Sequence, residues 1–73
     1  MDYVVELEKG VWIAPWEGDP GRTLVIGNAK YFETEKEARQ ELGSVISRYR
    51  YFRNAKIYQF DAGAIIELTN RRG

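Results

Sequence analysis

The chain has 73 residues, with eleven acidic and eleven basic side chains and neither Cys nor His. This length allows one small hydrophobic core, so residues 1–73 are interpreted as a single domain. The lack of Cys and His excludes disulfides, Cys/His zinc sites, haem ligation and iron–sulfur clusters. We therefore expect no cofactor and no metal.

Charge is unevenly distributed along the chain. Residues 1–41 carry nine acidic and five basic side chains, a net charge of −4, whereas residues 42–73 carry two acidic and six basic ones, a net charge of +4. The two halves either pair across the fold or form faces of opposite sign that meet partners. The balanced total argues against purely electrostatic binding to nucleic acid or anionic membranes.

Features of exported and membrane proteins are missing. No apolar run approaches the roughly 20 residues that cross a bilayer. The N-terminus lacks the basic segment, apolar stretch and small-residue cleavage site of a signal peptide. The sequence predicts a cytoplasmic protein.

The N-terminal third has the pattern of short strands. Apolar and other side chains alternate over residues 3–8, which is typical of a half-buried strand. The pattern stops at Lys9-Gly10 and resumes over residues 11–14, so the two segments form either a tight hairpin or one long bulged strand. A loop rich in Gly and Pro follows at residues 16–21, and residues 23–26 are interpreted as a third short strand.

A helix start is the clearest local signal. Thr34-Glu35-Lys36-Glu37 is a capping box, in which the Thr34 hydroxyl accepts from the Glu37 amide while Glu37 reaches back to the Thr34 amide. Behind it, apolar residues recur at helical spacing: Ala38, Leu42, Val45, Ile46 and Tyr49. We predict a helix over about residues 34–52. Gly43 is costly inside it, which suggests a close approach to a strand.

Two β-favouring runs complete the fold. Residues 56–60 and 64–68 are separated by Asp61-Ala62-Gly63, a loop with the length and composition of a hairpin connection. The order of elements predicts an α+β fold of the ββαβ type. We expect a mostly antiparallel sheet of three to five strands, covered on one face by a single helix.

One stretch carries a family resemblance. Residues 29–38 read AKYFETEKEA, the form A-x-x-F-x-T-x-x-E-A, and a β-hairpin with a Gly and an aromatic residue precedes them. The chain resembles many small, mostly uncharacterised bacteriophage and prophage proteins with a hairpin, a helix and a following strand. The resemblance covers roughly residues 3–60 and implies a fold entry, with Phe32 and Ala29 packed against the sheet. It implies no active site.

Residue types for catalysis are scarce. Without His or Cys, neither Ser44 nor Ser47 has a base of the usual kind. The four glutamates at positions 33, 35, 37 and 41 suit the positive end of the helix dipole better than a cation site. The loop glycines match no phosphate-binding motif. We predict a protein that is not an enzyme.

The aromatic residues of the strands are candidates for a protein contact. Trp12 alternates with Val11 and Ile13, so we expect it on the sheet face opposite the helix, together with Tyr58. With Val4 and with Leu24 or Ile26, they form an apolar patch on this face. We expect Trp12, Trp16 and Tyr58 to bind a protein partner or a second copy of the chain. The competing interpretation is that Trp16 and its loop fold over this face and close it.

A second candidate lies at the end of the predicted helix. The rings of Tyr49, Tyr51 and Phe52 are interleaved with Arg48, Arg50 and Arg53 and offer a stacking surface beside positive charge. The predicted site for single-stranded nucleic acid is Arg48, Arg50, Tyr51 and Arg53, with Arg71. The competing interpretation places Tyr49 in the core and leaves the arginines solvated. The favoured function is a protein–protein contact or a homodimer of phage or prophage origin, and the alternative is an accessory nucleic-acid-binding module.

Overall fold

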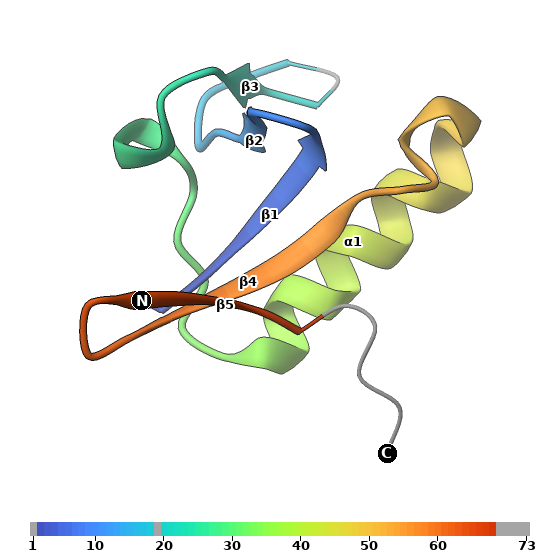
Figure 1. Ribbon diagram of the computed structural model, residues 1–73. Coiled ribbons are helices and arrows are strands. Elements are labelled where there is room, and N and C mark those ends of the chain that lie inside the picture. Colours follow the sequence, from blue (N-terminus) through green and yellow to red (C-terminus); the bar gives the residue numbers. More distant parts are fainter. Residues whose placement is uncertain (1, 19, 69–73) are drawn as a thin grey trace.

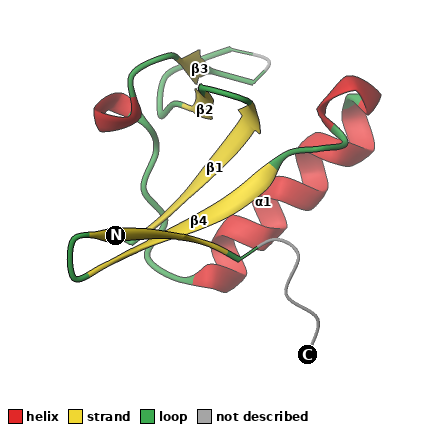
Figure 2. Cartoon of the chain, viewed as in Figure 1, coloured by secondary structure: helices red, strands yellow, loops and turns green. Residues whose placement is uncertain are grey.

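The computed structural model describes residues 2–18 and 20–68. Within these ranges, five strands form one antiparallel sheet in the order β3-β2-β1-β4-β5, and one α-helix, α1, packs against a single face of it (Figures 1 and 2). The predicted α+β fold is therefore confirmed. The elements are β1 (Tyr3–Glu8), β2 (Val11–Ile13), β3 (Arg22–Thr23), α1 (Glu35–Arg48), β4 (Lys56–Asp61) and β5 (Ala64–Glu67), with short 3₁₀ helices η1 (Ile26–Asn28) and η2 (Arg50–Phe52).

The first two strands form a tight hairpin, the first of the two predicted arrangements. Glu8 lies opposite Val11 across the Lys9-Gly10 turn, and the pairing is irregular between Glu6 and Glu8. The Gly10 N–H donates to Glu6 Oε2 over 3.0 Å, so the side chain of β1 satisfies a main-chain donor of the turn.

The predicted strand over residues 23–26 is mostly wrong. Only Arg22 and Thr23 pair with β2, opposite Ile13 and Trp12. The Val25 N–H donates to Thr23 Oγ1 over 3.1 Å, a local side-chain bond that competes with strand pairing and bends the chain into η1. As a result Leu24, which the strand prediction placed in the sheet, is 77% exposed.

The helix begins as predicted but ends earlier. Thr34 is the N-cap, and its Oγ1 accepts from the Glu37 N–H over 3.1 Å, whereas the Glu37 carboxylate accepts from the Glu33 N–H and not from that of Thr34. At Tyr49 the backbone becomes extended, with φ −132° and ψ 105°. The following 3₁₀ turn, η2, reverses the chain toward β4 and buries Phe52 completely.

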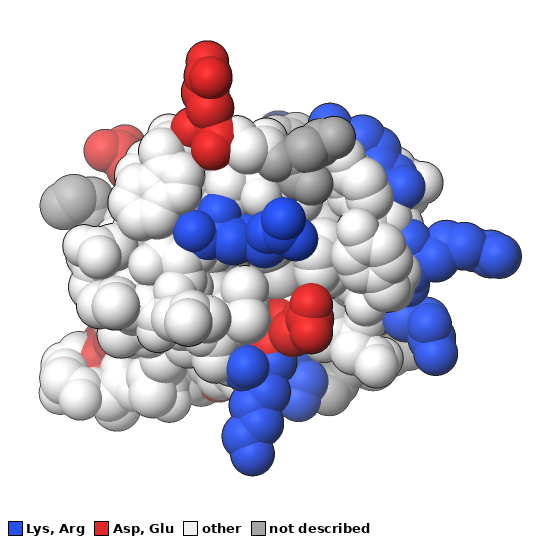
Figure 3. Space-filling view, turned by 90° about the horizontal axis from the view of Figure 1, so that it is seen from above, with Lys and Arg blue, Asp and Glu red and all other residues white. Residues whose placement is uncertain are grey.

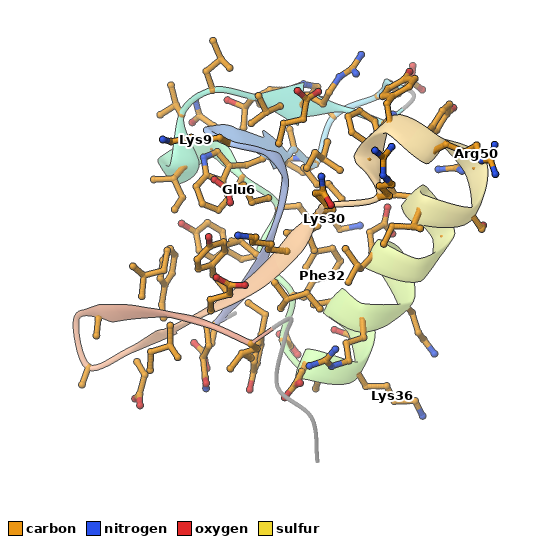
Figure 4. All side chains as sticks on the ribbon, turned by 45° about the vertical axis from the view of Figure 1, so that its right-hand side comes forward. Glu6, Lys9, Lys30, Phe32, Lys36 and Arg50 are labelled. Carbon is orange, nitrogen blue, oxygen red and sulfur yellow. The ribbon has the colours of Figure 1, made fainter. Side chains whose placement is uncertain are left out.

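The main core lies between α1 and the sheet. Its helical side consists of Ala38, Leu42 and Val45, while Ile46 and Tyr49 of the predicted stripe are only partly buried. Phe32 precedes α1 and pairs with Tyr3 of β1, and its ring points into the space between the sheet and the helix (Figure 4). The other members are Val5, Leu7, Ile13, Phe52, Ala55, Ile57 and Leu68.

The last two strands form the predicted hairpin. Asp61 pairs with Ala64, and the two residues between them, Ala62 and Gly63, have positive φ angles of 51° and 84°. Positive φ at both central positions defines a type I′ turn, which matches the right-handed twist of the strands it joins.

Candidate interaction surfaces

The sheet face away from α1, called the open face below, is built from alternate residues of each strand. Val5 and Ile57 point toward α1, so their neighbours Val4 and Tyr58, which lie opposite each other in the register, point away from it. The same alternation and register assign the remaining members of the open face: Glu6, Trp12, Thr23, Lys56, Phe60, Ile65 and Glu67.

Four partly buried rings form an aromatic cluster on the open face: Trp12, Tyr31, Tyr58 and Phe60. The rings of Trp12 and Tyr58 meet edge to face with centroids 5.7 Å apart, and those of Tyr31 and Phe60 lie 5.5 Å apart. Val4 points to this face and yet has 0% exposure. Val4 lies opposite Tyr58 in the register and outside the main core, so this face buries apolar surface of its own.

The sequence pattern identified half of this cluster. The predicted residues Trp12 and Tyr58 are brought together, but Tyr31 and Phe60 were not singled out. Alternation offered a signal for Phe60, which follows Tyr58 by two residues, but none for Tyr31, whose position depends on the pairing of Phe32 with Tyr3. The Tyr31 hydroxyl donates to the carbonyl oxygen of Ile26 over 3.2 Å, which ties the ring to η1.

A carboxylate and a phenol meet at the margin of the cluster. The Tyr58 hydroxyl donates to Glu6 Oε1 over 3.1 Å, and Lys56 Nζ lies 3.8 Å from Glu67 Oε1 on the same face. Burial, the hydrogen bond to Glu6 and the negative charges of Glu6 and Glu67 raise the pKa of Tyr58 to about 12. Tyr58 is therefore protonated at neutral pH, which suits a hydrogen-bond donor and not a base.

A groove of about 630 Å³ lies beside this pair. It runs between the β1–β2 turn, at Glu8 and Lys9, and Tyr51 with Asn54 ahead of β4. Glu6 and Tyr58 line it as well, but their facing polar atoms already bond to each other. The groove thus joins the open face to the end of the molecule that carries η2.

Trp16 is separate from the aromatic cluster. It lies in the loop after β2 and is 50% exposed, and within the described residues no ring contact links it to Trp12 or Tyr58. The Ala14 N–H donates to the Gly21 carbonyl over 2.9 Å and closes the loop. The main chain of Gly21 lies so close to the Trp16 carbonyl oxygen that a Cβ at position 21 would collide with it. Its half-exposed ring leaves the predicted closure of the open face incomplete.

The arginine-rich segment is gathered at the other end of the molecule. Arg48, Arg50 and Arg53 are exposed around η2. Basic side chains gather on the right of the view in Figure 3, the side of η2. Figure 4 shows Arg50 at the opposite end of α1 from Lys36. Arg22 of β3 joins them, because its Cζ lies 5.8 Å from the centroid of the Phe52 ring. We call these four residues the arginine cluster. Arg71, the fifth predicted member, lies outside the described residues.

Three aromatic residues support this end. Tyr49, Tyr51 and Phe52 contact one another, with the rings of Tyr51 and Phe52 only 4.7 Å apart. Phe52 is buried, so the predicted stacking surface reduces to Tyr51, which is 66% exposed, and the partly buried Tyr49.

Residues 2–18 and 20–68 show no ion pair between the two halves of the chain, the first of the two interpretations of their opposite charge. Among the described residues, the ion pairs are Arg39 with Glu35 at 2.7 Å and Lys56 with Glu67 at 3.8 Å, and each stays within its own half. No member of the arginine cluster forms an ion pair within that part of the chain. The positive charge at this end is therefore exposed rather than neutralised by the acidic half.

Known proteins add no assignment to these surfaces. A scan against protein-family models, a search of curated proteins and a search of solved structures each found no match. Across residues 2–18 and 20–68, no helix is long and apolar enough to span a bilayer, and no group of three or more acidic side chains is placed to hold a metal ion. The bacteriophage resemblance remains a prediction.

Proposed function

We propose that this protein acts by binding, through a protein–protein contact of its open face, with a second copy of the chain as the occupant. The aromatic cluster carries the proposal, because its rings lie on the face that buries Val4 and each keeps part of its own surface in solvent. Trp and Tyr contribute most to interface energies, and partly exposed apolar surfaces commonly mark interaction sites.

Catalysis does not form part of this proposal. The chain contains no His or Cys, and the polar pair in the groove consists of a protonated phenol and a carboxylate that accepts two hydrogen bonds. Neither group is arranged as a nucleophile beside a base.

Self-association is tested by sedimentation velocity from low micromolar to millimolar concentration. We expect the mass of the wild-type protein to rise toward that of a dimer, and Trp12→Gln to weaken this rise while the circular dichroism spectrum is retained. Tyr51→Gln changes an exposed ring at the opposite end and serves as the matched control. A wild-type protein that stays monomeric throughout would contradict self-association.

Single-stranded nucleic acid is the second candidate partner, favoured by the arginine cluster beside Tyr51. Its four arginines form no ion pair within the described residues and are suited to the phosphate backbone of a nucleic acid. The exposed ring of Tyr51 is suited to stacking on an unpaired base. We propose this as an accessory activity of the same protein.

A labelled single-stranded oligonucleotide, titrated at several salt concentrations, tests this candidate. We expect affinity to fall with salt, and Arg50→Gln to weaken binding and reduce the salt dependence by about one phosphate contact. Lys36→Gln, at the other end of α1, is the matched control (Figure 4). Equal losses from both substitutions would indicate non-specific attraction and reject the site.

A further inference from the structure

β5 is an edge strand without the usual protection against pairing with another chain. It lies at the end of the sheet order, its register with β4 is regular, and it contains neither Pro nor a basic residue. Ile65 and Ile66 are both exposed, at 47% and 38%. The opposite edge, β3, is limited to two residues and carries Arg22. Natural sheets commonly guard their edges by short strands, charges or bulges. β5 has four residues, a regular register and one charge, Glu67, at its end, so its exposed centre at Ile65 and Ile66 carries no charge or bulge.

The main-chain groups of Ile65 point away from the sheet. In a hairpin with a two-residue turn, the residues that flank the turn, here Asp61 and Ala64, exchange hydrogen bonds, and bonded pairs then recur at every second residue. The Leu68 N–H donates to the Ile57 carbonyl over 2.8 Å, which follows the same alternation. Ala64 and Ile66 therefore bond to β4, and the N–H and C=O of Ile65 face the edge.

We propose that β5 pairs antiparallel with β5 of a second copy, about a two-fold axis that passes between the two Ile65 residues. This goes beyond the proposed contact of the open face: it rests on self-association but adds a contact at the sheet edge, three strands away from Trp12 on β2. The two Ile65 residues then exchange both main-chain hydrogen bonds, and the two sheets become continuous. An axis perpendicular to the sheet keeps the open faces of both copies on the same side.

The register follows from the side chains. In a pairing centred on Ile65, the two Ile65 residues face each other, Ile66 faces Ala64 of the other copy, and Glu67 faces Gly63 of the other copy. Exposed apolar side chains then meet apolar side chains, and no like charges are opposed. Pairing centred on Ile66 would instead set Ile65 against Glu67. In the first register, Ile65 also extends the aromatic cluster across the interface, because Phe60 lies opposite it within each copy.

Cross-linking of the full chain tests this register. The sequence contains no Cys, so Ile65→Cys introduces a single thiol, and directly opposed residues of a bonded antiparallel pair lie about 5.5 Å apart at Cα, within disulfide range. Under mild oxidation we expect a covalent dimer from Ile65→Cys and little from Leu24→Cys, which places a thiol on a more exposed aliphatic position elsewhere. Equal cross-linking by both variants would overturn the register.

Sedimentation of a charged variant separates this inference from the proposed function. Ile65→Lys places two cations against each other at the axis, so we expect the dissociation constant to rise more than about tenfold, while Leu24→Lys leaves it unchanged. Wild-type association that Ile65→Lys does not alter would overturn pairing through β5 and leave self-association by another part of the open face. A monomeric wild-type protein would overturn both.

Discussion

The face of the sheet that α1 covers and the open face are made by the same strands, yet they exclude water by different means. Val5 points to α1 and belongs to the main core, whereas Val4, the preceding residue, is buried to the same extent on the open face, opposite Tyr58. The helix covers its face with side chains that are themselves buried, while the four rings of the open face remain partly exposed. An incomplete second layer of this kind adds buried apolar surface to a small domain and leaves ring surface in solvent, which the proposed contact would use.

The largest effect that this comparison predicts is at Phe52, in the covered core. Phe52→Ala should lower the free energy of unfolding by about 3–5 kcal/mol, because it removes a fully buried ring where η2 turns toward β4. Tyr51→Ala, one residue earlier and 66% exposed, should change it little. Chemical denaturation measures both. A small loss at Phe52 would mean that η2 is not part of the core.

A matched pair of substitutions tests whether the open face is a true second layer. Val4→Ala and Val5→Ala remove the same atoms from adjacent, fully buried positions on opposite faces. Each should cost about 2 kcal/mol, from the lost burial of two carbon groups and the cavity that remains. If only Val5→Ala destabilises the protein in denaturation, the rings do not seal Val4, and the two faces differ more than the structure indicates.

The elements that local patterns specify were predictable from the sequence. Alternation defined residues 3–8, the capping box fixed Thr34 as the N-cap, and the composition of Asp61-Ala62-Gly63 indicated a hairpin. The errors arose where local polar bonds or tertiary packing decided the outcome. Thr23 ended a strand by bonding to the main chain of Val25, and the turn after Tyr49 cut the predicted helix short.

The candidate surfaces were predictable only in part, because they depend on which residues the topology brings together. Alternation placed Trp12 and Tyr58 on one face, but the approach of Tyr31 depends on the segment before α1 pairing with β1. Arg22 likewise reaches the arginines of η2 from β3, far away in the sequence. Neither approach leaves a local pattern.

A smaller effect is expected at Gly43, where the predicted close approach to a strand is wrong. Gly43 is exposed, and a Cβ built there would meet nothing within 4 Å outside the helix's own backbone. Gly43→Ala should therefore raise the free energy of unfolding by roughly 0.5–1 kcal/mol, because Ala restricts the unfolded chain and favours the helix. Gly21→Ala is the contrasting control and should destabilise the protein, since its Cβ would collide with the Trp16 carbonyl oxygen. Thermal unfolding compares the two variants.

The smallest effect at neutral pH is expected at Tyr58, where the comparison of the two faces becomes a pH dependence. The Tyr58→Phe variant loses the hydrogen bond to Glu6, but Glu6 still accepts from the Gly10 N–H and contacts solvent, so the loss in free energy of unfolding should be below about 1 kcal/mol.

At alkaline pH the stabilities of the wild-type protein and Tyr58→Phe should diverge, because the pKa of Tyr58 is about 12 in the folded protein and about 10 when unfolded. A raised pKa means that the protonated phenol contributes stability fully below about pH 10, and that this contribution is lost as the pH rises toward 12. The wild-type protein should therefore lose more stability than the variant between these pH values. Urea unfolding measures the difference in stability between the two proteins at each pH. A difference that stays constant would show instead that the hydroxyl of Tyr58 is solvated and that the rings of the open face do not exclude water from it.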